Sequence, residues 1–395
     1  MKSLSLATVF AALSGFGIIF IAPHAMPRVE VEEFMAFWGL FFAITGLIDG
    51  LMQETTRSVS SARSHDQLPL VVANPWRTAA GIASVLGFIA IISSPLWLML
   101  LSTTSGAAVA LLAFGLMSYV FQALMSGLLS GTEKWPLLAA LLTLDSGIRL
   151  GLVLLAWWAG WGLPMFLVIT VIGALSWLII FPLAKDAVRA QTDCAPVVFR
   201  RNTLSAMMAT GATALLITGF PTFIKATQDP TPVAGVTMAA VMYAVTLTRA
   251  PILVPLQRFQ SALIVNFVAG RAHVLQALAK PVAAVFALGV SGGALAWLIG
   301  PWIMETLWGP DYAVPGVVLA ILTLASACTG ALMITGTATL AIERYRSYVL
   351  GWVVATVVAF AMLLLPFTLA TNVCTALLLG PAVGALVHVS ALVRD

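Results

Sequence analysis

The chain is organised into long runs of apolar residues, separated by short segments that contain proline, glycine or charged residues. An α-helix needs about 20 apolar residues to cross roughly 30 Å of hydrocarbon. Most of the runs reach or exceed that length. They predict an all-α polytopic membrane protein with twelve spanning helices, at residues 3–22, 34–57, 78–101, 104–130, 136–159, 162–183, 203–223, 233–258, 276–299, 313–340, 345–368 and 372–393.

The composition excludes a soluble protein. Hydrophobic residues make up 61% of the chain and charged residues 9%, with a mean hydropathy of +1.04, whereas soluble domains carry about 25% charged residues. The net charge of +4 is dispersed through short loops, so no nucleic-acid partner is expected. Cys194, Cys328 and Cys374 form no C-x-x-C pair, which predicts neither a metal site nor a disulfide framework.

The first apolar run is longer than the core of a secretory signal peptide. Such a core has about 7–15 residues and precedes a cleavage site built from small residues. Pro23-His24-Ala25 follows this run and is a poor site of that kind. We therefore expect the run to remain as the first membrane helix.

Lysine and arginine in the loops indicate the orientation, because cytoplasmic loops are enriched in them. With the N-terminus inside, the cytoplasmic side would hold thirteen of these residues: Lys2, Arg63, Arg77, Lys134, Lys185, Arg189, Arg200, Arg201, Arg271, Lys280, Arg344, Arg346 and Arg394. The opposite side would hold only Arg28 and Lys225. Both termini are therefore predicted to be cytoplasmic, in a bacterial plasma membrane.

The longest cytoplasmic loop lies near the middle of the chain and divides the spans into six and six. This predicts an N-terminal six-helix bundle at 1–185, a linker at 186–202 and a C-terminal bundle at 203–395. An offset near 200 residues places Arg57 opposite Arg258, and Glu133-Lys134-Trp135 is echoed by Glu343-Arg344-Tyr345. Internal repeats of this kind are typical of transporters, whose substrate site lies between the halves.

Four arginines lie in or at the ends of the apolar runs, and they are the main candidates for substrate binding. A guanidinium in hydrocarbon costs at least about 2.5–3.5 kcal/mol on insertion scales. Such groups therefore face a protein interior or a water-filled cavity. The four are Arg57, Arg149, Arg249 and Arg258.

In the second run, Asp49, Gln53 and Arg57 are spaced four residues apart and share one face of the helix. Gly46 and Gly50 line the same side, where a neighbour or a ligand can approach closely. The stripe is interpreted as the lining of a cavity. The alternative is an ion ladder within the helix, with Arg57 reaching back to the cytoplasmic surface.

In the fifth run, Asp145 and Arg149 are also four residues apart. Counted from the start of the run at 1.5 Å per residue, Arg149 lies roughly 20 Å into the membrane. At that depth Arg149 is predicted to pair with Asp145. The pair either opens to admit an anionic substrate or is purely structural.

The eighth run combines basic and amide side chains with two prolines, Pro251 and Pro255, which should kink or unwind the helix. Arginine presents a planar fork of donors that suits phosphate oxygens. A phosphate-binding role is therefore predicted for Arg249, Gln257, Arg258 and Gln260. The alternative is a helix that leaves the membrane near residue 256, with Arg258 as its first cytoplasmic charge.

Several short segments carry a resemblance to a known family. They are Phe37-Trp38-Gly39-Leu40 through Gln53-Glu54-Thr55-Thr56-Arg57, Asp145-Ser146-Gly147-Ile148-Arg149, Arg249-Ala250-Pro251 and Trp308-Gly309-Pro310-Asp311-Tyr312. The chain resembles polysaccharide exporters and flippases of the multidrug/oligosaccharidyl-lipid/polysaccharide (MOP) superfamily, particularly compact actinobacterial-type members. The resemblance implies two six-helix bundles around a central cavity that opens alternately to either side. It also implies a glycan carried on polyprenyl pyrophosphate as the substrate.

The predicted function is therefore that of a flippase for a lipid-linked oligosaccharide, with the bilayer and other glycan-assembly proteins as partners. A cation-coupled drug exporter of the same fold is the first alternative, but the first helix lacks the acidic residue typical of such exporters. A membrane enzyme that uses Glu30, Glu32 or Glu33 in an outer loop is the second, and no enzyme activity is expected. No cofactor is predicted.

Energy coupling could use protons, sodium ions or the membrane potential. A carboxylate in or near the membrane is needed for the first two. The carboxylates placed for such a role are Asp49, Glu54 and Asp145. The four histidines show no metal-ligand spacing, and His388 lies in the last run.

Overall fold

The computed structural model describes residues 2–64, 71–95, 106–228, 236–269, 274–342 and 344–393. Within these residues the chain is helical and contains no β-strand. Contacts divide it into two compact units, residues 1–222 and 223–395. The all-α membrane fold expected from the apolar runs is confirmed.

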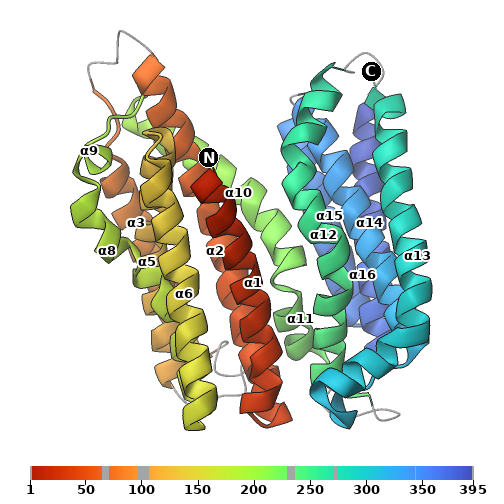
Figure 1. Ribbon diagram of the computed structural model, residues 1–395. Helices are drawn as coiled ribbons and strands as arrows, with labels where there is room; N and C mark the ends of the chain where they lie inside the picture. The colour runs from red at the N-terminus through yellow and green to blue at the C-terminus, as the bar shows by residue number, and fades with distance from the viewer. Residues whose placement is uncertain are drawn as a thin grey trace. The chain divides into compact units, whose positions relative to one another are not determined.

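The first unit contains the first six spans and the helix that follows them (Figure 1). Its elements are α1 (Lys2–Ala25), α2 (Arg28–Ser64), α3 (Pro75–Ile92), α5 (Gly106–Gly131), α6 (Trp135–Ala159), α7 (Leu163–Ile172), η1 (Gly173–Leu175), α8 (Trp177–Ile180), η2 (Phe181–Leu183), α9 (Lys185–Val188) and α10 (Pro196–Ile217). The elements from α7 to η2 form one span, Leu163–Leu183.

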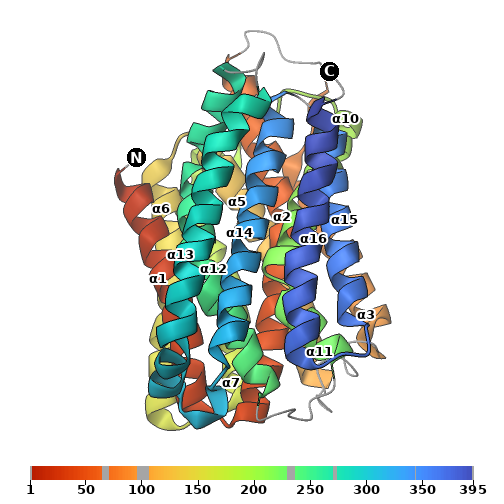
Figure 2. The same ribbon diagram turned by 90° about the vertical axis from the view of Figure 1, so that its right-hand side faces the viewer.

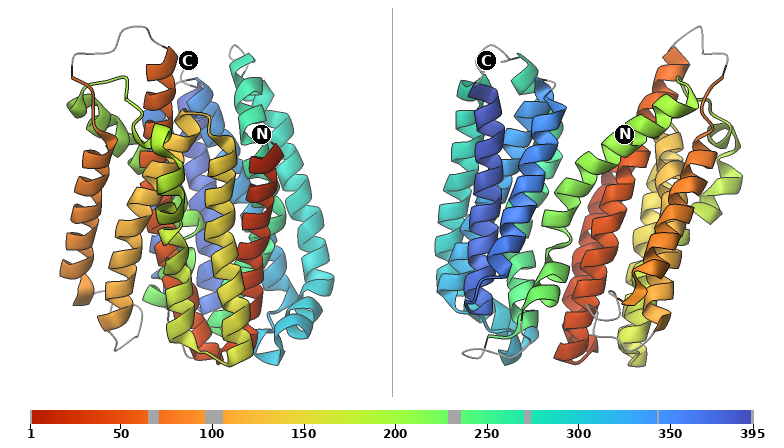
Figure 3. Two further views of the ribbon diagram at one scale, coloured as in Figure 1. Left: turned by 60° about the vertical axis from the view of Figure 1, so that its left-hand side comes forward. Right: turned by 180° about the vertical axis from the view of Figure 1, so that it is seen from behind.

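Helix α2 lies at the centre of this unit, where it packs against α5 and α10. Helix α1 packs against α6, and α3 packs against α5 (Figure 3). Phe41, Leu112, Leu124 and Leu128 belong to the buried core between α2 and α5. Local signals fix the helix ends: the side chain of Asn74 caps α3 by accepting from the amides of Trp76 and Arg77.

The second unit is a bundle around α14, which packs against α12, α13 and α16, while α15 packs against α16 (Figure 2). Its elements are the larger part of α11 (Phe220–Thr227), α12 (Met238–Ala269), α13 (Val274–Trp308), η4 (Pro310–Tyr312), α14 (Gly316–Ala341), α15 (Tyr345–Leu363) and α16 (Leu369–Val393).

The number of spans agrees with the sequence-based expectation. Among the described residues, 11 helices are long and apolar enough to cross a membrane, and α10 with α11 makes a further span bent by 60°. Each span overlaps one of the predicted runs. The protein is therefore a multi-pass integral membrane protein.

An internal repeat is visible in the backbone. Helices α5 and α14 begin 210 residues apart, as do α6 and α15. The turns between them match as well: Lys134 has φ −80° and ψ 56°, and Arg344 has φ −89° and ψ 60°. Each of these two amides donates to the carbonyl five residues earlier at 2.8 Å. The chain therefore has two repeated bundles, as predicted.

The contact-based division does not fall at the predicted linker, residues 186–202. Helix α10, the seventh span, packs along α2 within the first unit, so the division comes after Thr222 instead. A division based on contacts need not coincide with the boundary between two sequence repeats. The predicted bundle boundaries, 1–185 and 203–395, therefore stay a prediction.

The eighth span does not unwind at its prolines, and a kink there, the other predicted possibility, stays a prediction. Helix α12 continues through Pro251 and Pro255, and α13 continues through Pro281 and Pro301. Proline removes a helical hydrogen bond, but spanning helices tolerate it where neighbouring groups satisfy the freed carbonyl.

Candidate functional site

The most buried ion pair among the described residues of the first unit joins Asp145 and Arg149 of α6. Nη2 of Arg149 lies 2.8 Å from Oδ1 of Asp145, and the arginine side chain is 6% exposed. Gln122 of α5 donates to the same carboxylate oxygen at 3.2 Å. The pairing predicted from the i, i+4 spacing is confirmed, because the helix brings both side chains to one face.

The guanidinium of Arg149 also lies near an aromatic ring, and two of its nitrogens donate no hydrogen bond to a described residue. Its carbon lies 5.0 Å from the ring centroid of Phe42, a cation–π distance. The contact between Nη2 of Arg149 and Asp145 is an ion pair by distance, but its geometry is not that of a hydrogen bond. Neither Nη2 nor Nε donates a hydrogen bond to a described residue. A Cβ atom at Gly173 would overlap Nε, so only glycine leaves room for the arginine here.

A cavity of about 220 Å³ adjoins this pair. Helix α1 forms one wall, and α2 and α6 form the others. Its lining consists of Ala11, Ser14, Gly15, Ile18, Trp38, Phe42, Asp145, Ser146 and Arg149. The hydroxyl of Ser14 is buried and has no hydrogen-bond partner among the described residues. The cavity therefore presents a cation, a carboxylate, two hydroxyls and two aromatic rings.

Asp49 of α2 forms a separate polar contact. Its Oδ1 accepts a hydrogen bond from the phenol of Tyr119 on α5 at 2.8 Å. No ion pair joins Asp49 to another described residue. Asp49 therefore differs from the other two predicted coupling residues, since Glu54 and Asp145 both have an arginine partner.

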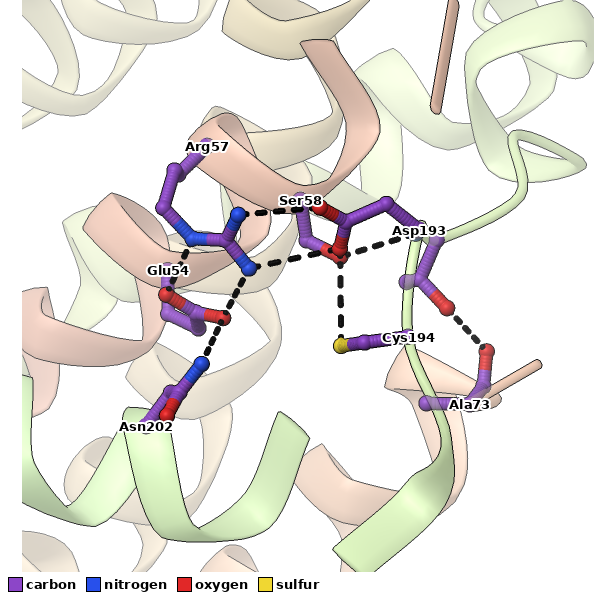
Figure 4. Close-up of polar contacts among 8 residues, drawn as sticks. Glu54, Arg57, Ser58, Ala73, Asp193, Cys194 and Asn202 are labelled. Carbon is purple, nitrogen blue, oxygen red and sulfur yellow. Dashed lines mark hydrogen bonds and ion pairs between the residues drawn. The ribbon is translucent and has the colours of Figure 1, made fainter. Parts of the chain in front are cut away.

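Arg57 is held by two carboxylates (Figure 4). Its Nε and Nη2 donate to Glu54 at 2.9 and 2.7 Å, and its Nη1 donates to Asp193 at 2.9 Å. Asn202 of α10 also donates to Glu54, at 3.2 Å, and Ser58 donates to Asp193 at 2.6 Å. This cluster ties α2 to α10 and to the segment that precedes it.

The charge of Asp193 is well stabilised. Burial alone would raise the pKa of this carboxyl, but hydrogen bonds from Arg57, Ser58 and Ser61 and the charge of Arg57 hold its pKa well below the usual range. A depressed carboxyl pKa stabilises the folded state above the ordinary pKa, and the effect is lost only as pH falls through the depressed value. The Arg57–Asp193 pair therefore persists at every physiological pH.

The remaining predicted site residues are not part of these clusters. Gln53 is exposed on α2. Arg249 is 7% exposed in α12 of the second unit. The side chains of Gln257, Arg258 and Gln260 lie outside the described part of the chain, so the predictions for them and the pairing of Arg57 with Arg258 remain predictions.

The acidic cluster predicted for an outer loop lies in the first turns of α2. Oε2 of Glu30 accepts a hydrogen bond from the amide of Leu163 at the start of α7, at 3.0 Å. A carboxylate is favourable at the positive end of a helix. The loop assignment for Glu30, Glu32 and Glu33 is therefore wrong, and Glu30 caps a neighbouring helix.

Sequence reasoning missed several polar residues that complete these clusters, among them Ser14, Tyr119, Gln122 and Asp193. Tyr119 and Gln122 are three residues apart in an otherwise apolar run, a signal that could have identified them. Ser14 is a single hydroxyl in an apolar helix, and Asp193 lies in a loop. Nothing in the local sequence distinguishes those two.

Two solved structures illustrate the fold that this chain shares with known proteins. An inward-facing multidrug resistance MATE transporter aligns with a TM-score of 0.71 at 16% identity, over 98% of this chain and 96% of its own. The lipid II flippase MurJ, in an inward closed conformation, aligns with a TM-score of 0.68 at 11% identity, over 100% of this chain and 88% of its own. The chain thus has the fold that these two proteins share.

Sequence relatives place the chain in a family with members in Mycobacterium tuberculosis. The uncharacterized protein Rv1510 of Mycobacterium tuberculosis is 38% identical over 392 residues, which cover 98% of this chain and 90% of the relative. The uncharacterized protein Rv3630 of the same species is 38% identical over 398 residues, with the same coverage. No protein-family model matches the sequence. The chain belongs to the family of these relatives, and it lies in the bacterial plasma membrane.

Proposed function

We propose that the protein is a flippase that moves a polyprenyl-pyrophosphate-linked glycan across the plasma membrane by alternating access. The observation that carries the proposal is the buried guanidinium of Arg149, whose Nε and Nη2 donate no hydrogen bond to a described residue. Buried donors without partners cost about 1–3 kcal/mol each. Phosphate oxygens are acceptors of the geometry that arginine favours.

The size of the cavity favours a headgroup over a drug. Pockets for drug-sized ligands have about 300–1,000 Å³, whereas this cavity has about 220 Å³. A phosphate group and part of a sugar fit the smaller space, with Ser14 and Ser146 as hydrogen-bonding groups. The shared fold is compatible with either substrate class, since one relative in structure is named a multidrug resistance transporter and another a lipid II flippase.

The other arginines take different parts in this proposal. Arg57 can capture a pyrophosphate at the cytoplasmic side only by leaving Glu54 and Asp193, which engage its guanidinium. Arg249 is the substrate-binding group of the second unit, assisted by Gln257, Arg258 and Gln260. Asp49 is the preferred coupling residue, because its described partner is a neutral phenol.

The experiment is mass spectrometry of lipid that co-purifies with the protein, compared between wild type and Arg149→Lys. Lysine keeps the charge but loses the planar fork. Loss of a charge-assisted hydrogen bond, worth about 1.5–3 kcal/mol, should lower the bound polyprenyl pyrophosphate by roughly tenfold to a hundredfold. Arg77→Ala, which removes an exposed arginine of α3, is the matched control and should retain the lipid.

A second variant distinguishes loss of lipid binding from misfolding. Asp145→Asn combined with Arg149→Gln leaves no unpaired charge and should also lose the lipid while remaining folded. The proposal is overturned if wild type carries no pyrophosphate lipid, or if all variants carry as much as wild type. A resistance phenotype to small molecules, without such a lipid, would instead support drug export.

A further inference from the structure

His388 is completely buried among three helices of the second unit. It belongs to α16, and its ring stacks on Tyr348 of α15 with centroids 6.2 Å apart and planes inclined by 2°. Nδ1 lies 3.1 Å from the hydroxyl oxygen of Thr335 on α14. Glycine makes room for the ring on α15, since a Cβ atom at Gly351 would overlap the imidazole.

One nitrogen of the ring has a defined role. Nε2 lies 3.0 Å from the carbonyl oxygen of Tyr348. A carbonyl oxygen only accepts, so Nε2 carries a hydrogen and donates it. The protonation state of His388 therefore depends on Nδ1 alone.

The hydroxyl of Thr335 lies within hydrogen-bond distance of three acceptors. Its oxygen is 3.1 Å from Nδ1 of His388, 2.9 Å from the carbonyl oxygen of Ala331 and 3.1 Å from that of Leu332. A hydroxyl has one hydrogen to donate and two lone pairs to accept with. With a neutral ring, Thr335 donates to Nδ1 and neither carbonyl receives its hydrogen. With a protonated ring, Nδ1 donates to Thr335, and Thr335 donates to the nearer carbonyl oxygen, that of Ala331.

No carboxylate of the described chain lies beside the ring. Tyr348 stacks on it, and Arg344 at the start of α15 donates to the carbonyl of Ala391 on α16. The other charged residues on the packed helices are Arg249, Arg258, Lys280, Glu305 and Arg346. Residues 275–282 of α13 line one groove with residues 382–389 of α16, so Glu305 lies near the opposite end of α13. Hydrogen bonds, rather than an opposite charge, must therefore accommodate a proton.

The second half of the sequence offers few other proton acceptors in this pH range. Between residues 236 and 393 the only acidic residues are Glu305, Asp311 and Glu343, near or beyond helix ends. Histidine is the side chain whose ordinary pKa, about 6.5, places its charge change between pH 5 and 8. His388 is the histidine within the spans of this unit.

We propose that His388 is a proton-binding site of the second unit. A proton from the aqueous phase adds to Nδ1, the hydroxyl hydrogen of Thr335 turns from Nδ1 to the carbonyl oxygen of Ala331, and the new Nδ1–H donates to Thr335. No heavy atom has to move. The added charge lies where α14, α15 and α16 meet. The inference does not depend on the nature of the substrate.

The experiment follows the imidazole nitrogens of the full chain in lipid bilayers by ¹⁵N solid-state NMR. Glutamine replaces His24, His65 and His273, so that the remaining signal belongs to His388. The expected result is conversion between pH 8 and 4.5 from one protonated nitrogen to two. A ring that stays neutral down to pH 4.5 would overturn the proposal.

The role of the threonine is tested by Thr335→Val, which keeps the side-chain shape and removes the hydroxyl. The titration midpoint should fall by about one pH unit, a tenfold loss of proton affinity. Thr329→Val on the same helix is the matched control, because that hydroxyl donates to the backbone of Ala325. An unchanged midpoint in Thr335→Val would show that the histidine has only a packing role and would overturn the proposed hydroxyl switch.

Discussion

Arg57 and Arg149 carry the same charge but are held in different ways. Two carboxylates engage three nitrogens of Arg57, whose side chain is 48% exposed. One carboxylate contacts Arg149, whose side chain is 6% exposed. Exposed ion pairs contribute about 0–1 kcal/mol to stability, whereas a buried charge needs its partner. Of the two, Arg149 has more to gain from an anionic ligand.

Asp49 supports a prediction about coupling at this scale. If its carboxyl takes up and releases a proton during transport, Asp49→Asn fixes it in a neutral form. Transport by the reconstituted protein should then fall at least tenfold, since a tenfold change corresponds to only about 1.4 kcal/mol. Its dependence on pH should also disappear.

The measurement is lipid flipping in proteoliposomes as a function of pH. Glu133→Gln is the control, because Glu133 is exposed in the turn before α6. A pH profile of Asp49→Asn that matches wild type would exclude Asp49 as the coupling group.

At this scale the sequence predicted some partners and missed others, for a physical reason. Asp145 and Arg149 are joined by the helix that carries them, so their spacing was sufficient. Asp193 reaches Arg57 only because the segment before α10 lies beside α2, across 136 residues of chain. Contacts of that kind depend on tertiary structure and leave no local pattern.

Helices α2 and α10 approach each other through small residues. A Cβ atom at Gly50 would overlap the backbone of Met207, and one at Gly46 would overlap the side chain of Ala214. Small residues let helix backbones approach closely in a membrane, where packing drives association. Sequence reasoning expected either a neighbour or a ligand at these two glycines, and in the structure a neighbouring helix, α10, lies there.

The element-scale prediction follows from this contact. Gly50→Ala should destabilise the protein by about 1–3 kcal/mol, because overpacking a tight contact forces the backbones apart. Thermal unfolding in detergent would detect this as a lower Tm. Gly151→Ala is the matched control: a Cβ atom there meets nothing within 4 Å, and alanine favours the helix by about 1 kcal/mol. Equal Tm values for the two variants would contradict a tight α2–α10 contact.

The helices themselves were predictable, because hydropathy and length depend only on local sequence. The ends of the helices were less predictable from the sequence. Pro281 and Pro301 mark turns in the sequence but lie inside α13. Whether a proline ends a spanning helix depends on neighbouring groups that can satisfy the freed carbonyl, and those are set by the fold.

At the scale of the whole molecule, the two repeats are similar in backbone and different in chemistry. Positions 210 residues beyond Asp145 and Arg149 are Ala355 and Ala359, and the position beyond Gln122 is Leu332. The contacts among Gln122, Asp145 and Arg149 of the first unit therefore have no counterpart at the equivalent positions of the second.

The predicted orientation is tested at this scale. Green fluorescent protein fused after Asp395 should fluoresce, and alkaline phosphatase at the same position should be inactive, because both termini are expected in the cytoplasm. Phosphatase fused after Gly160, in the turn between α6 and α7, should be active. The opposite pattern would mean that the loop charges do not set the orientation.

The matching turns before α6 and α15 have a consequence for the origin of the molecule. An ancestral chain of six spans, an even number, begins and ends on the same side of the membrane. A tandem gene duplication of such a chain would add a second copy that inserts in the same direction without any change to its loop charges. Fusion of the two copies into one chain would then allow substitutions to accumulate in one half without being imposed on the other.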